Sequence, residues 1–200
     1  PKVMAEKARE YDIPFIHFST DYVFDGKKKG AYKEDDPTNP LGVYGASKWA
    51  GEEAIQHVGG KFYIFRTSWV YSDIGHNFYL TMKRLSEKPD EIRVVSDQFG
   101  VPTSNLFIAK QTKKMINQLT SENVGIYHLV PDGQSSWYEF AKQIITKTTP
   151  AFDINNILPV DTDQYPTNAK RPKSSVLDNS LIKTVFMLKF DDWKTELRKL

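Results

Sequence analysis

Short apolar runs alternate along this chain with longer stretches of helical character, and this alternation constrains the fold more than any other feature. The clearest apolar runs are residues 13–18 and 62–65. Apolar residues recur at helical spacing before the first run, at 3–11, and a second helical stretch at 42–58 separates the two runs. Parallel strands need a long crossover, usually a helix, so strands that alternate with helices favour a parallel sheet. The sequence therefore predicts an α/β fold.

The alternation continues more weakly through the rest of the chain. Beyond Pro150 the pattern is irregular until a final helix. The further expected elements are extended segments at 92–95 and 125–130 and helices at 77–86, 107–119, 136–146 and 191–200.

Polar and aromatic residues follow the first two expected strands, at 19–22 and at 66–69. In open parallel sheets, ligands bind outside the carboxyl ends of the strands. The first of these segments opens a stretch rich in Gly, Asp, Lys and Pro, residues 20–41. A loop of this length in a compact domain is usually functional or disordered. We therefore expect the chemistry of the protein where these two strand ends meet.

Composition excludes several classes of function. The chain has 27 basic and 25 acidic residues, and its only basic run, Lys27-Lys28-Lys29, lies between two glycines as in a solvated loop, so nucleic acid is not an expected partner. No apolar run approaches the length of a membrane span, so a membrane partner is not expected either. The absence of cysteine excludes disulfide and thiolate chemistry and fits the cytoplasm. The four histidines lack metal-ligand spacing and no GxSxG motif is present, so neither a metal site nor a hydrolase is expected.

Three tyrosines are each followed by a lysine four residues later, which places a phenol and an ammonium on one face of a helix. These pairs are Tyr44–Lys48, Tyr79–Lys83 and Tyr138–Lys142. A nearby cation favours the phenolate and lowers the tyrosine pKa, and such a tyrosine can protonate a carbonyl oxygen as a hydride reaches the carbon. Because about one such match is expected by chance, the spacing needs support from its context.

Context favours the first pair. Tyr44 opens its helix directly after the long loop, and the small residues between Tyr44 and Lys48 would let a cofactor lie along the helix face. The other two pairs lie among large apolar residues, where packing in the core or at the surface explains them.

The neighbourhood of Tyr44 resembles the dTDP-4-dehydrorhamnose reductases, a family of the extended short-chain dehydrogenase/reductase superfamily. The resemblance covers essentially the whole chain in the family's order and spacing. Its motifs are Phe18-Ser19-Thr20-Asp21-Tyr22 through Gly26, residues 37–48 with Gly51-Glu52, Arg66-Thr67-Ser68-Trp69-Val70-Tyr71, residues 97–103, residues 136–141, and Arg171-Pro172 ahead of residues 175–178.

In that family a Thr, a Tyr and a Lys form the catalytic group, and they match Thr20, Tyr44 and Lys48. The resemblance implies that Tyr44 protonates the C4 carbonyl oxygen of a 4-keto sugar. Lys48 would lower the pKa of Tyr44 and bond the nicotinamide ribose, so Tyr44 and Lys48 are also the expected cofactor contacts. The Thr20 hydroxyl would hydrogen-bond the reacting oxygen or tune the tyrosine. Hydride from NADPH or NADH would reach C4 and give dTDP-L-rhamnose.

Thr20, Asp21 and Trp69 match positions that contact the sugar nucleotide. Arg171 is the expected diphosphate partner, because a planar guanidinium suits phosphate. Each residue also has a simpler explanation. The Thr20 hydroxyl could bond its own backbone, and Asp21 could form an Asx turn. Trp69 could be buried in the core, and Arg171 could lie at the surface. Tyr22 stands where related 4,6-dehydratases carry Glu, so dehydratase chemistry is not expected.

The resemblance also implies a partial Rossmann-like, doubly wound parallel sheet with a small mixed substrate-binding subdomain. We expect residues 1–70 and 104–130 in the cofactor domain, and residues 71–103 and 131–200 mainly in the substrate-binding subdomain. The family's glycine-rich pyrophosphate turn has no counterpart among the eleven glycines. Because the chain begins directly in a helix, we expect a truncated chain that binds NADPH negligibly and is inactive alone.

The expected partner is a dTDP-sugar substrate. Some family members dimerise around magnesium through a Glu that directly follows the Pro-Thr motif. In this chain residues 104–106 follow that motif and none of them is Glu, so the magnesium-linked dimer is not expected. Self-association through an exposed sheet edge is a separate expectation. The alternative is a non-catalytic binding protein similar to the regulatory subunit of methionine adenosyltransferase; the intact Thr20, Tyr44 and Lys48 favour the reductase.

Overall fold

A three-stranded parallel sheet forms the centre of the molecule in the computed structural model, which describes residues 1–165, 167 and 169–200. Its strands β1 (Phe15–Thr20), β2 (Phe62–Thr67) and β7 (Gly125–His128) lie in the order β1-β2-β7. The register aligns Thr20 with Thr67, so β1 and β2 end side by side. The expected meeting of these two strand ends is confirmed.

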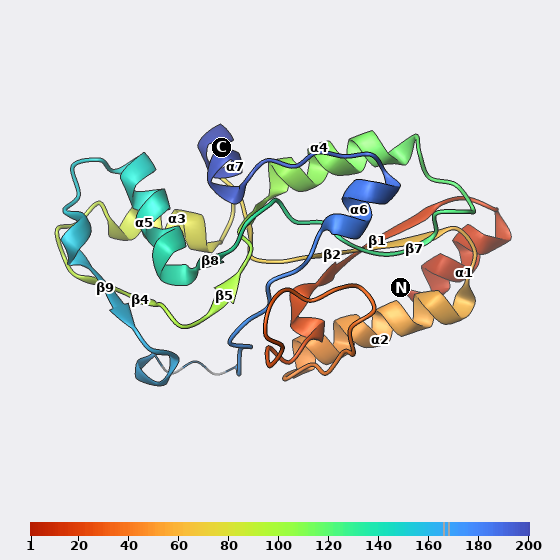
Figure 1. The fold of residues 1–200 in the computed structure, drawn as a ribbon, viewed down its shortest axis with the longest axis horizontal. Coiled ribbons are helices and arrows are strands. Elements are labelled where there is room, and N and C mark those ends of the chain that lie inside the picture. Colours follow the sequence, from red (N-terminus) through yellow and green to blue (C-terminus); the bar gives the residue numbers. More distant parts are fainter. Residues whose placement is uncertain (166, 168) are drawn as a thin grey trace.

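Helices cover both faces of this sheet (Figure 1). Helices α1 (Lys2–Glu10) and α2 (Val43–Val58) lie on one side, and α4 (Asn105–Ile116) and α6 (Ser180–Val185) lie on the other. Parallel strands with helices on both faces are the doubly wound arrangement that the sequence predicts, and the α/β fold class is confirmed.

The remaining elements form a second, smaller part at the left of Figure 1, with parallel and antiparallel strand pairs. Strand β4 pairs with β9 in parallel, and β5 pairs with β8 antiparallel. Strands β3 and β6 pair in parallel between the two parts. Three short 3-10 helices, η1 (Asp21–Val23), η2 (Ile154–Asn156) and η3 (Thr162–Gln164), complete the described structure. The other bounds are β3 (Val70–Tyr71), α3 (Phe78–Leu85), β4 (Ile92–Val95), β5 (Phe99–Gly100), β6 (Thr103–Ser104), β8 (Ser135–Ser136), α5 (Trp137–Thr148), β9 (Ile157–Val160) and α7 (Trp193–Lys199).

Capping residues explain where several helices begin and end. The hydroxyls of Ser104 and Ser136 accept hydrogen bonds from the backbone of the third residue of α4 and α5, which satisfies donors that a helix start leaves free. Helix α2 ends at Gly59, whose φ of 73° is easy for glycine and strained for other residues.

Apolar clusters lie on both faces of the sheet and in the second part. Ile64 on β2 packs with Ala5, Ile55 and Val58 of α1 and α2. The opposite face of β2 and β7 packs against α4 and α6 through Tyr63, Phe65, Phe107, Met115, Tyr127, Leu129, Ile182 and Phe186. A separate cluster fills the second part, with members that include Tyr71, Tyr79, Met82, Ile92, Val94, Phe140, Ile144, Ile157 and Trp193.

The packing bears on the proposed domain division. Every buried member of the cluster in the second part comes from residues 71–103 or 131–200, in line with the expected boundaries. Residues 182–190, however, pack against the central sheet. We therefore keep the division as a proposal, with residues 182–190 assigned to the sheet.

The prediction of an irregular chain between Pro150 and the final helix was wrong at β9 and α6. Strand β9 is short and contains a proline, and it becomes a strand by pairing with the distant β4. Helix α6 has six residues, too few to show a periodic pattern.

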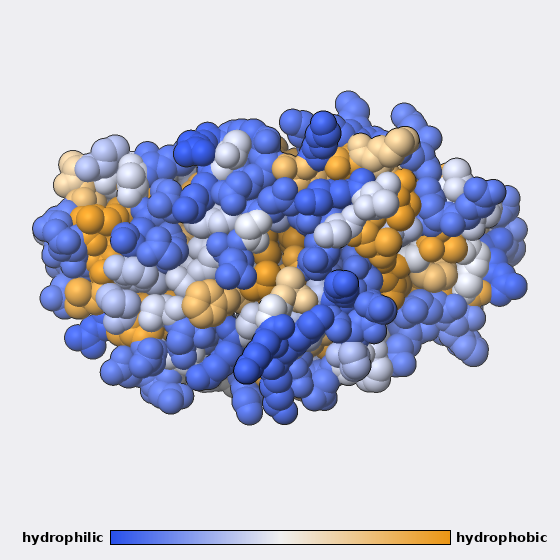
Figure 2. Space-filling view, viewed as in Figure 1, coloured by the Kyte–Doolittle hydropathy of each residue, from blue (hydrophilic) through white to orange (hydrophobic). Residues whose placement is uncertain are grey.

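No helix in the described part of the chain combines the length and apolarity needed to cross a membrane. The face shown in Figure 2 is mostly hydrophilic, and its hydrophobic residues gather in separate areas.

Candidate active site

The ends of β1 and β2 form the floor of the site. Thr20, the last residue of β1, lies beside Thr67, the last residue of β2, and Ser19 lies beside Arg66. All four are buried. Polar side chains therefore stand next to one another at the carboxyl edge of the sheet, where open parallel sheets bind ligands.

Thr20 and Asp21 turn the chain from β1 into η1. The Thr20 hydroxyl accepts a hydrogen bond from the backbone N–H of Tyr22 at 3.2 Å and donates to Asp21 Oδ1 at 3.1 Å. The simpler alternative for Thr20, a hydroxyl bonded to its local backbone, is thus realised. The same side chain also lines a cavity, so the two roles coincide.

Tyr44 stands at the start of α2 with 58% of its surface exposed. Its ring meets the Tyr22 ring edge to face, at 6.2 Å between centroids and 85° between planes. A side chain at Gly45 would collide with the Tyr22 carbonyl oxygen. The glycine that the sequence analysis assigned to cofactor access therefore lets α2 approach η1, while Ala46 and Ser47 remain exposed.

Lys48 lies one helical turn after Tyr44 and reaches across to β1. Its ammonium group donates a hydrogen bond to the backbone carbonyl oxygen of Phe18 at 2.6 Å. The lysine is therefore held two residues before Thr20, on the strand that carries the site.

Trp69 follows β2 and stacks on Trp137, the first residue of α5, with ring centroids 3.7 Å apart and planes 9° apart. Its backbone is left-handed, with a φ of 46°, which is uncommon for a residue other than glycine. A side chain at Gly100 would run into the Trp69 indole. The stack thus needs an unusual backbone angle at one residue and the absence of a side chain at another.

These side chains surround one cavity of about 280 Å³. Of the six predicted site residues, Thr20, Asp21, Tyr44, Trp69 and Arg171 line it, and Lys48 is held on Phe18 as described above. The other lining residues are Ser19, Tyr22, Thr67, Val70 and Trp137.

Three buried polar atoms in the wall of this cavity have no hydrogen-bond partner among the described residues. They are the Ser19 hydroxyl, Asp21 Oδ2 and the Thr67 hydroxyl. Buried polar groups in folded proteins are nearly always hydrogen-bonded, so each of these atoms needs a partner that a water molecule or a small movement of the cavity wall would supply.

Burial changes the acidity of two groups in this wall. Burial of the Asp21 carboxyl raises its pKa to about 7, against the lowering effect of the nearby Ser175 hydroxyl and of the hydrogen bond from Thr20. Burial, together with the negative charge of Asp21, raises the pKa of Tyr22 to about 12. Asp21 therefore changes charge near neutral pH, and Tyr22 remains a phenol.

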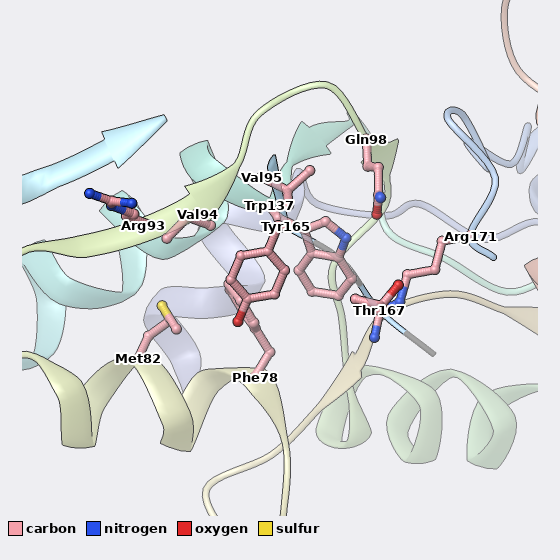
Figure 3. Close-up of a pocket in the computed structure, with 10 residues that line it drawn as sticks. All are labelled: Phe78, Met82, Arg93, Val94, Val95, Gln98, Trp137, Tyr165, Thr167 and Arg171. Atoms are coloured by element: carbon pink, nitrogen blue, oxygen red, sulfur yellow. The ribbon is translucent and has the colours of Figure 1, made fainter. Parts of the chain in front are cut away.

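A second cavity of about 190 Å³ adjoins the first, because Trp137 and Arg171 line both. Figure 3 shows the Trp137 and Tyr165 rings near its middle, with Arg171 and Gln98 to one side and Arg93 to the other. The remaining lining residues are Phe78, Met82, Val94, Val95 and Thr167. The two cavities together make a cleft that is polar at the strand ends and aromatic beyond the Trp69–Trp137 stack.

Most residues of the aromatic half of this cleft are not among the site residues that the sequence predicts. Trp137 and Gln98 fall within motifs quoted for the resemblance, at 136–141 and 97–103, and that position was the available signal. Tyr165 and Phe78 lie outside those motifs, and only the folding of the chain brings them to the cleft.

The other Tyr–Lys pairs and His128 pack within the fold, away from the site. Tyr79 is buried in the core of the second part, and Lys142 lies over the Tyr138 ring at 5.3 Å, as the packing explanation predicted. His128 is fully buried, with Nδ1 at 3.0 Å from the Asp178 carbonyl oxygen. Within the described ranges, no group of three or more His, Cys, Asp or Glu side chains could hold a metal ion.

Comparisons with known proteins give a consistent result. The family model described as the RmlD substrate binding domain matches residues 1–200. A dTDP-4-dehydrorhamnose reductase from Burkholderia thailandensis is 39% identical, over 96% of this chain and 68% of its own length. Two solved structures of enzymes with that name are also similar. The one from Bacillus anthracis, in complex with NADP, is 35% identical with a TM-score of 0.90, over 99% of this chain and 68% of its own. The one from Clostridium acetobutylicum is 38% identical with a TM-score of 0.91, over 100% and 69%.

Proposed function

The chain belongs to the RmlD substrate-binding-domain family, and from that premise we propose that it works as an NAD(P)H-dependent reductase of a dTDP-sugar. The reaction is reduction of the 4-keto group of dTDP-4-dehydro-L-rhamnose to the alcohol of dTDP-L-rhamnose, a precursor of cell-surface polysaccharide. A non-catalytic regulatory role is not favoured, because matched relatives such as those from Burkholderia thailandensis and Escherichia coli are reductases by name.

The observation that carries the proposal is the group of polar residues that line one cavity with Tyr44. Ser19, Thr20, Asp21 and Thr67, at the carboxyl ends of β1 and β2, line the same cavity as Tyr44. A sugar that carries hydroxyls next to a ketone offers hydrogen-bond partners to hydroxyl and carboxyl groups of this kind. This edge is also where open parallel sheets bind ligands.

Tyr44 is the proposed general acid. When bound, the reduced nicotinamide supplies a hydride to C4 of the sugar. The Tyr44 phenol gives its proton to the carbonyl oxygen, so the product carries one added hydrogen on carbon and one on oxygen. The exposure of Tyr44 at the mouth of the cavity leaves its hydroxyl free to meet a substrate.

Lys48 and Thr20 are proposed to support this proton transfer. The Lys48 ammonium, held on the Phe18 carbonyl, places a positive charge on the side of α2 that carries Tyr44. Lys48 also has hydrogens to donate to the ribose of the cofactor. The Thr20 hydroxyl lies in the cavity wall and can donate to the reacting oxygen after exchanging its contact with Asp21.

The residues at the start of helix α2 fit a nicotinamide cofactor. Ala46 and Ser47 leave the face of α2 beside Tyr44 exposed, and Lys48 is only partly buried. Tyr44 and Lys48 are the residues that would hold the nicotinamide ribose.

The adjoining cavities suit the two halves of the sugar nucleotide. The polar cavity suits the sugar, and the aromatic cavity offers the Trp137 and Tyr165 rings to a planar base. Arg171 lines both cavities, so its guanidinium is available to the diphosphate that joins the two halves.

Two further points stay proposals. We place the reaction in the cytoplasm, because NADPH and dTDP-sugars are cytoplasmic metabolites and the chain has no cysteine. We also propose self-association through β1, which pairs only with β2 among the described strands. Size-exclusion chromatography that gives only monomers at high protein concentration would contradict the second point.

The test of function compares two tyrosines that share the same spacing to a lysine. In the longest form of the protein that its gene encodes, NADPH consumption with dTDP-4-dehydro-L-rhamnose is measured for Tyr44→Phe and for Tyr138→Phe. We expect Tyr44→Phe to lower kcat by roughly 10²-fold or more, because general acid catalysis contributes on that scale, and Tyr138→Phe to change it less than about twofold. Undiminished turnover by Tyr44→Phe would refute the assignment.

A further inference from the structure

A buried ion pair lies directly behind the catalytic tyrosine and lysine. The guanidinium of Arg66 on β2 donates three hydrogen bonds to the Glu52 carboxylate on α2: Nε to Oε1 at 3.1 Å, Nε to Oε2 at 3.2 Å and Nη2 to Oε2 at 2.7 Å. The Arg66 side chain is 3% exposed and that of Glu52 is fully buried. This is the forked geometry in which arginine holds a carboxylate in a defined orientation.

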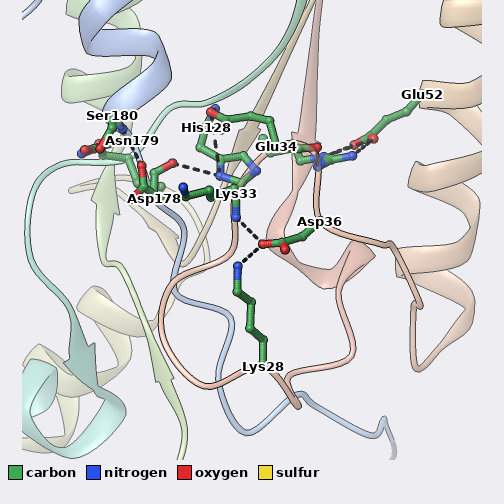
Figure 4. A network of polar contacts seen from close by, with 11 residues as sticks. Lys28, Lys33, Glu34, Asp36, Glu52, His128, Asp178, Asn179 and Ser180 are labelled. Atoms are coloured by element: carbon green, nitrogen blue, oxygen red, sulfur yellow. Dashed lines mark hydrogen bonds and ion pairs between the residues drawn. The ribbon is translucent and has the colours of Figure 1, made fainter.

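The same guanidinium also holds the loop that leads into α2. Arg66 Nη1 donates to the backbone carbonyl oxygen of Glu34 at 3.3 Å, and the guanidinium carbon lies 5.1 Å from the centre of the Phe24 ring. The Glu34 carboxylate in turn accepts a hydrogen bond from the backbone N–H of His128 on β7 at 3.0 Å. Figure 4 shows Glu52 reaching in from its helix and Glu34 and His128 gathered beside this contact.

Arg66 thus connects every element that carries a proposed catalytic residue. In the register of β1 and β2, Arg66 lies beside Ser19, and Ser19 is the residue before Thr20. Its partner Glu52 is four residues after Lys48 and eight after Tyr44, so the three side chains share one face of α2. A helix held at Glu52 cannot slide or rotate against β2 without moving both Lys48 and Tyr44.

We propose that the Arg66–Glu52 pair positions helix α2 against the sheet, so that Tyr44 and Lys48 meet the substrate held at Thr20. Neither residue of the pair lines the catalytic cavity, so both act through the residues that they hold. The inference rests on the proposed reductase function for its kinetic test only.

Stability and positioning can be separated, because buried ion pairs behave unusually on substitution. Removing one partner leaves an unpaired buried charge and destabilises the fold, whereas replacing both partners by apolar residues of similar volume is often neutral or stabilising. The double variant Glu52→Leu with Arg66→Met therefore keeps a packed interior, and it loses the directional fork together with the hydrogen bond from Arg66 to the Glu34 carbonyl oxygen. A structural pair would tolerate this exchange, and a positioning pair would not.

The kinetic experiment measures kcat, KM and the melting temperature of the double variant in the longest form that the gene encodes. We expect a melting temperature close to that of the unchanged protein, a kcat at least tenfold lower, and a KM changed less than about threefold, because a misplaced general acid affects the reaction more than ground-state binding. A folded double variant with unchanged kcat would overturn the proposal.

The control is an ion pair at the other end of the same strand. Lys61, directly before β2, pairs with Asp12 at 2.7 Å on the surface. Lys61→Met should leave kcat unchanged, because surface pairs contribute little and this one lies far from the strand ends. If Lys61→Met lowers kcat as much as the double variant does, the effect is not specific to Glu52 and the proposal fails.

A readout without turnover tests the same geometry. Replacing Tyr44 with a fluorinated tyrosine reports its edge-to-face contact with Tyr22 by fluorine NMR. We expect the resonance to move in the double variant and to stay in place in Lys61→Met. If the unchanged protein shows no turnover, the proposed function fails, while this shift still decides whether the pair positions Tyr44; an unmoved resonance would overturn the positioning role.

A milder variant covers the case in which the double variant does not fold. Arg66→Lys keeps the charge and loses the fork, since a lysine is a point charge with no planar donor array. We expect a folded protein with kcat lowered several-fold. A folded Arg66→Lys protein with the kcat and the Tyr44 resonance of the unchanged protein would overturn the proposal.

Discussion

Helices α2 and α5 carry the same Tyr–Lys spacing near their amino termini and use it in different ways. In α2, Lys48 reaches away from its helix to the Phe18 carbonyl oxygen on β1, and Tyr44 opens onto the cavity at the strand ends. In α5, Lys142 folds back over the Tyr138 ring at 5.3 Å and lies 3.8 Å from Glu139 on the same helix. The first pair connects two elements and the second remains on its own helix. Equal spacing therefore gives unequal surroundings, because the neighbouring strand decides where the ammonium goes.

The largest effect should come from breaking the pair on α2. Lys48→Met removes the positive charge beside Tyr44 and its anchor on β1, and we expect kcat to fall by roughly 10²-fold, in the range of general acid–base contributions. The matched change on α5, Lys142→Met, should leave kcat within about twofold. Steady-state NADPH consumption measures both variants, and equal losses from the two would remove the distinction drawn between the helices.

The Asp21 carboxyl next to this site should show a pH-dependent cost of burial. Its folded pKa of about 7 exceeds its ordinary value of 3.8, so the native state binds more protons than the unfolded chain between those pH values. The contribution of this carboxyl to the free energy of unfolding is therefore largest below pH 3.8, and it is lost as the pH rises from there through about 7. Asp21→Asn cannot ionise and should be more stable than the unchanged chain by on the order of 2 kcal/mol above pH 8, since each pKa unit corresponds to about 1.4 kcal/mol and some hydrogen bonding is lost.

Thermal unfolding of both proteins across the pH range measures this difference. It should shrink as the pH falls from about 7 toward 3.8 and reverse in sign at lower pH, where the Asp21 carboxyl is protonated in both the folded and the unfolded chain and only the hydrogen bonding lost in the Asn variant remains. A constant difference at all pH values would show that Asp21 does not titrate in this window.

The smallest effect should come from replacing Trp137, the residue of α5 that lines both cavities. Trp137→Leu removes one half of the stack with Trp69 and one wall of both cavities. We expect dTDP to bind about tenfold more weakly, since aromatic stacking contributes about 0.5–1.5 kcal/mol beyond burial. Isothermal titration calorimetry on the present chain gives the dissociation constant.

The adjacent change Tyr138→Leu is the control for this experiment, because Tyr138 lines neither cavity. Its dTDP affinity should match that of the unchanged chain. If Tyr138→Leu weakens dTDP binding as much as Trp137→Leu, the loss comes from disturbing α5 rather than from the stack.

The sequence predicted the elements that have strong local signals. The apolar runs at β1 and β2 and the helical stretches at α1 and α2 appear in the structure within a few residues of the expected bounds. Elements that depend on distant partners were missed. Strand β9 exists through its pairing with β4, and the aromatic cavity brings Phe78, Trp137 and Tyr165 together from three separate segments.

By itself, the sequence determined the alternation of strands and helices, the two polar strand ends and the motif order that names the catalytic candidates. These properties depend on residues that are close in the sequence and on helical or strand periodicity, so they can be recognised from the sequence directly. Only the tertiary structure decided where the Lys48 ammonium is held, and that Arg66 and Glu52 join strand β2 to helix α2. Those outcomes depend on contacts between residues far apart in the chain, and spacing along the sequence carries no information about them.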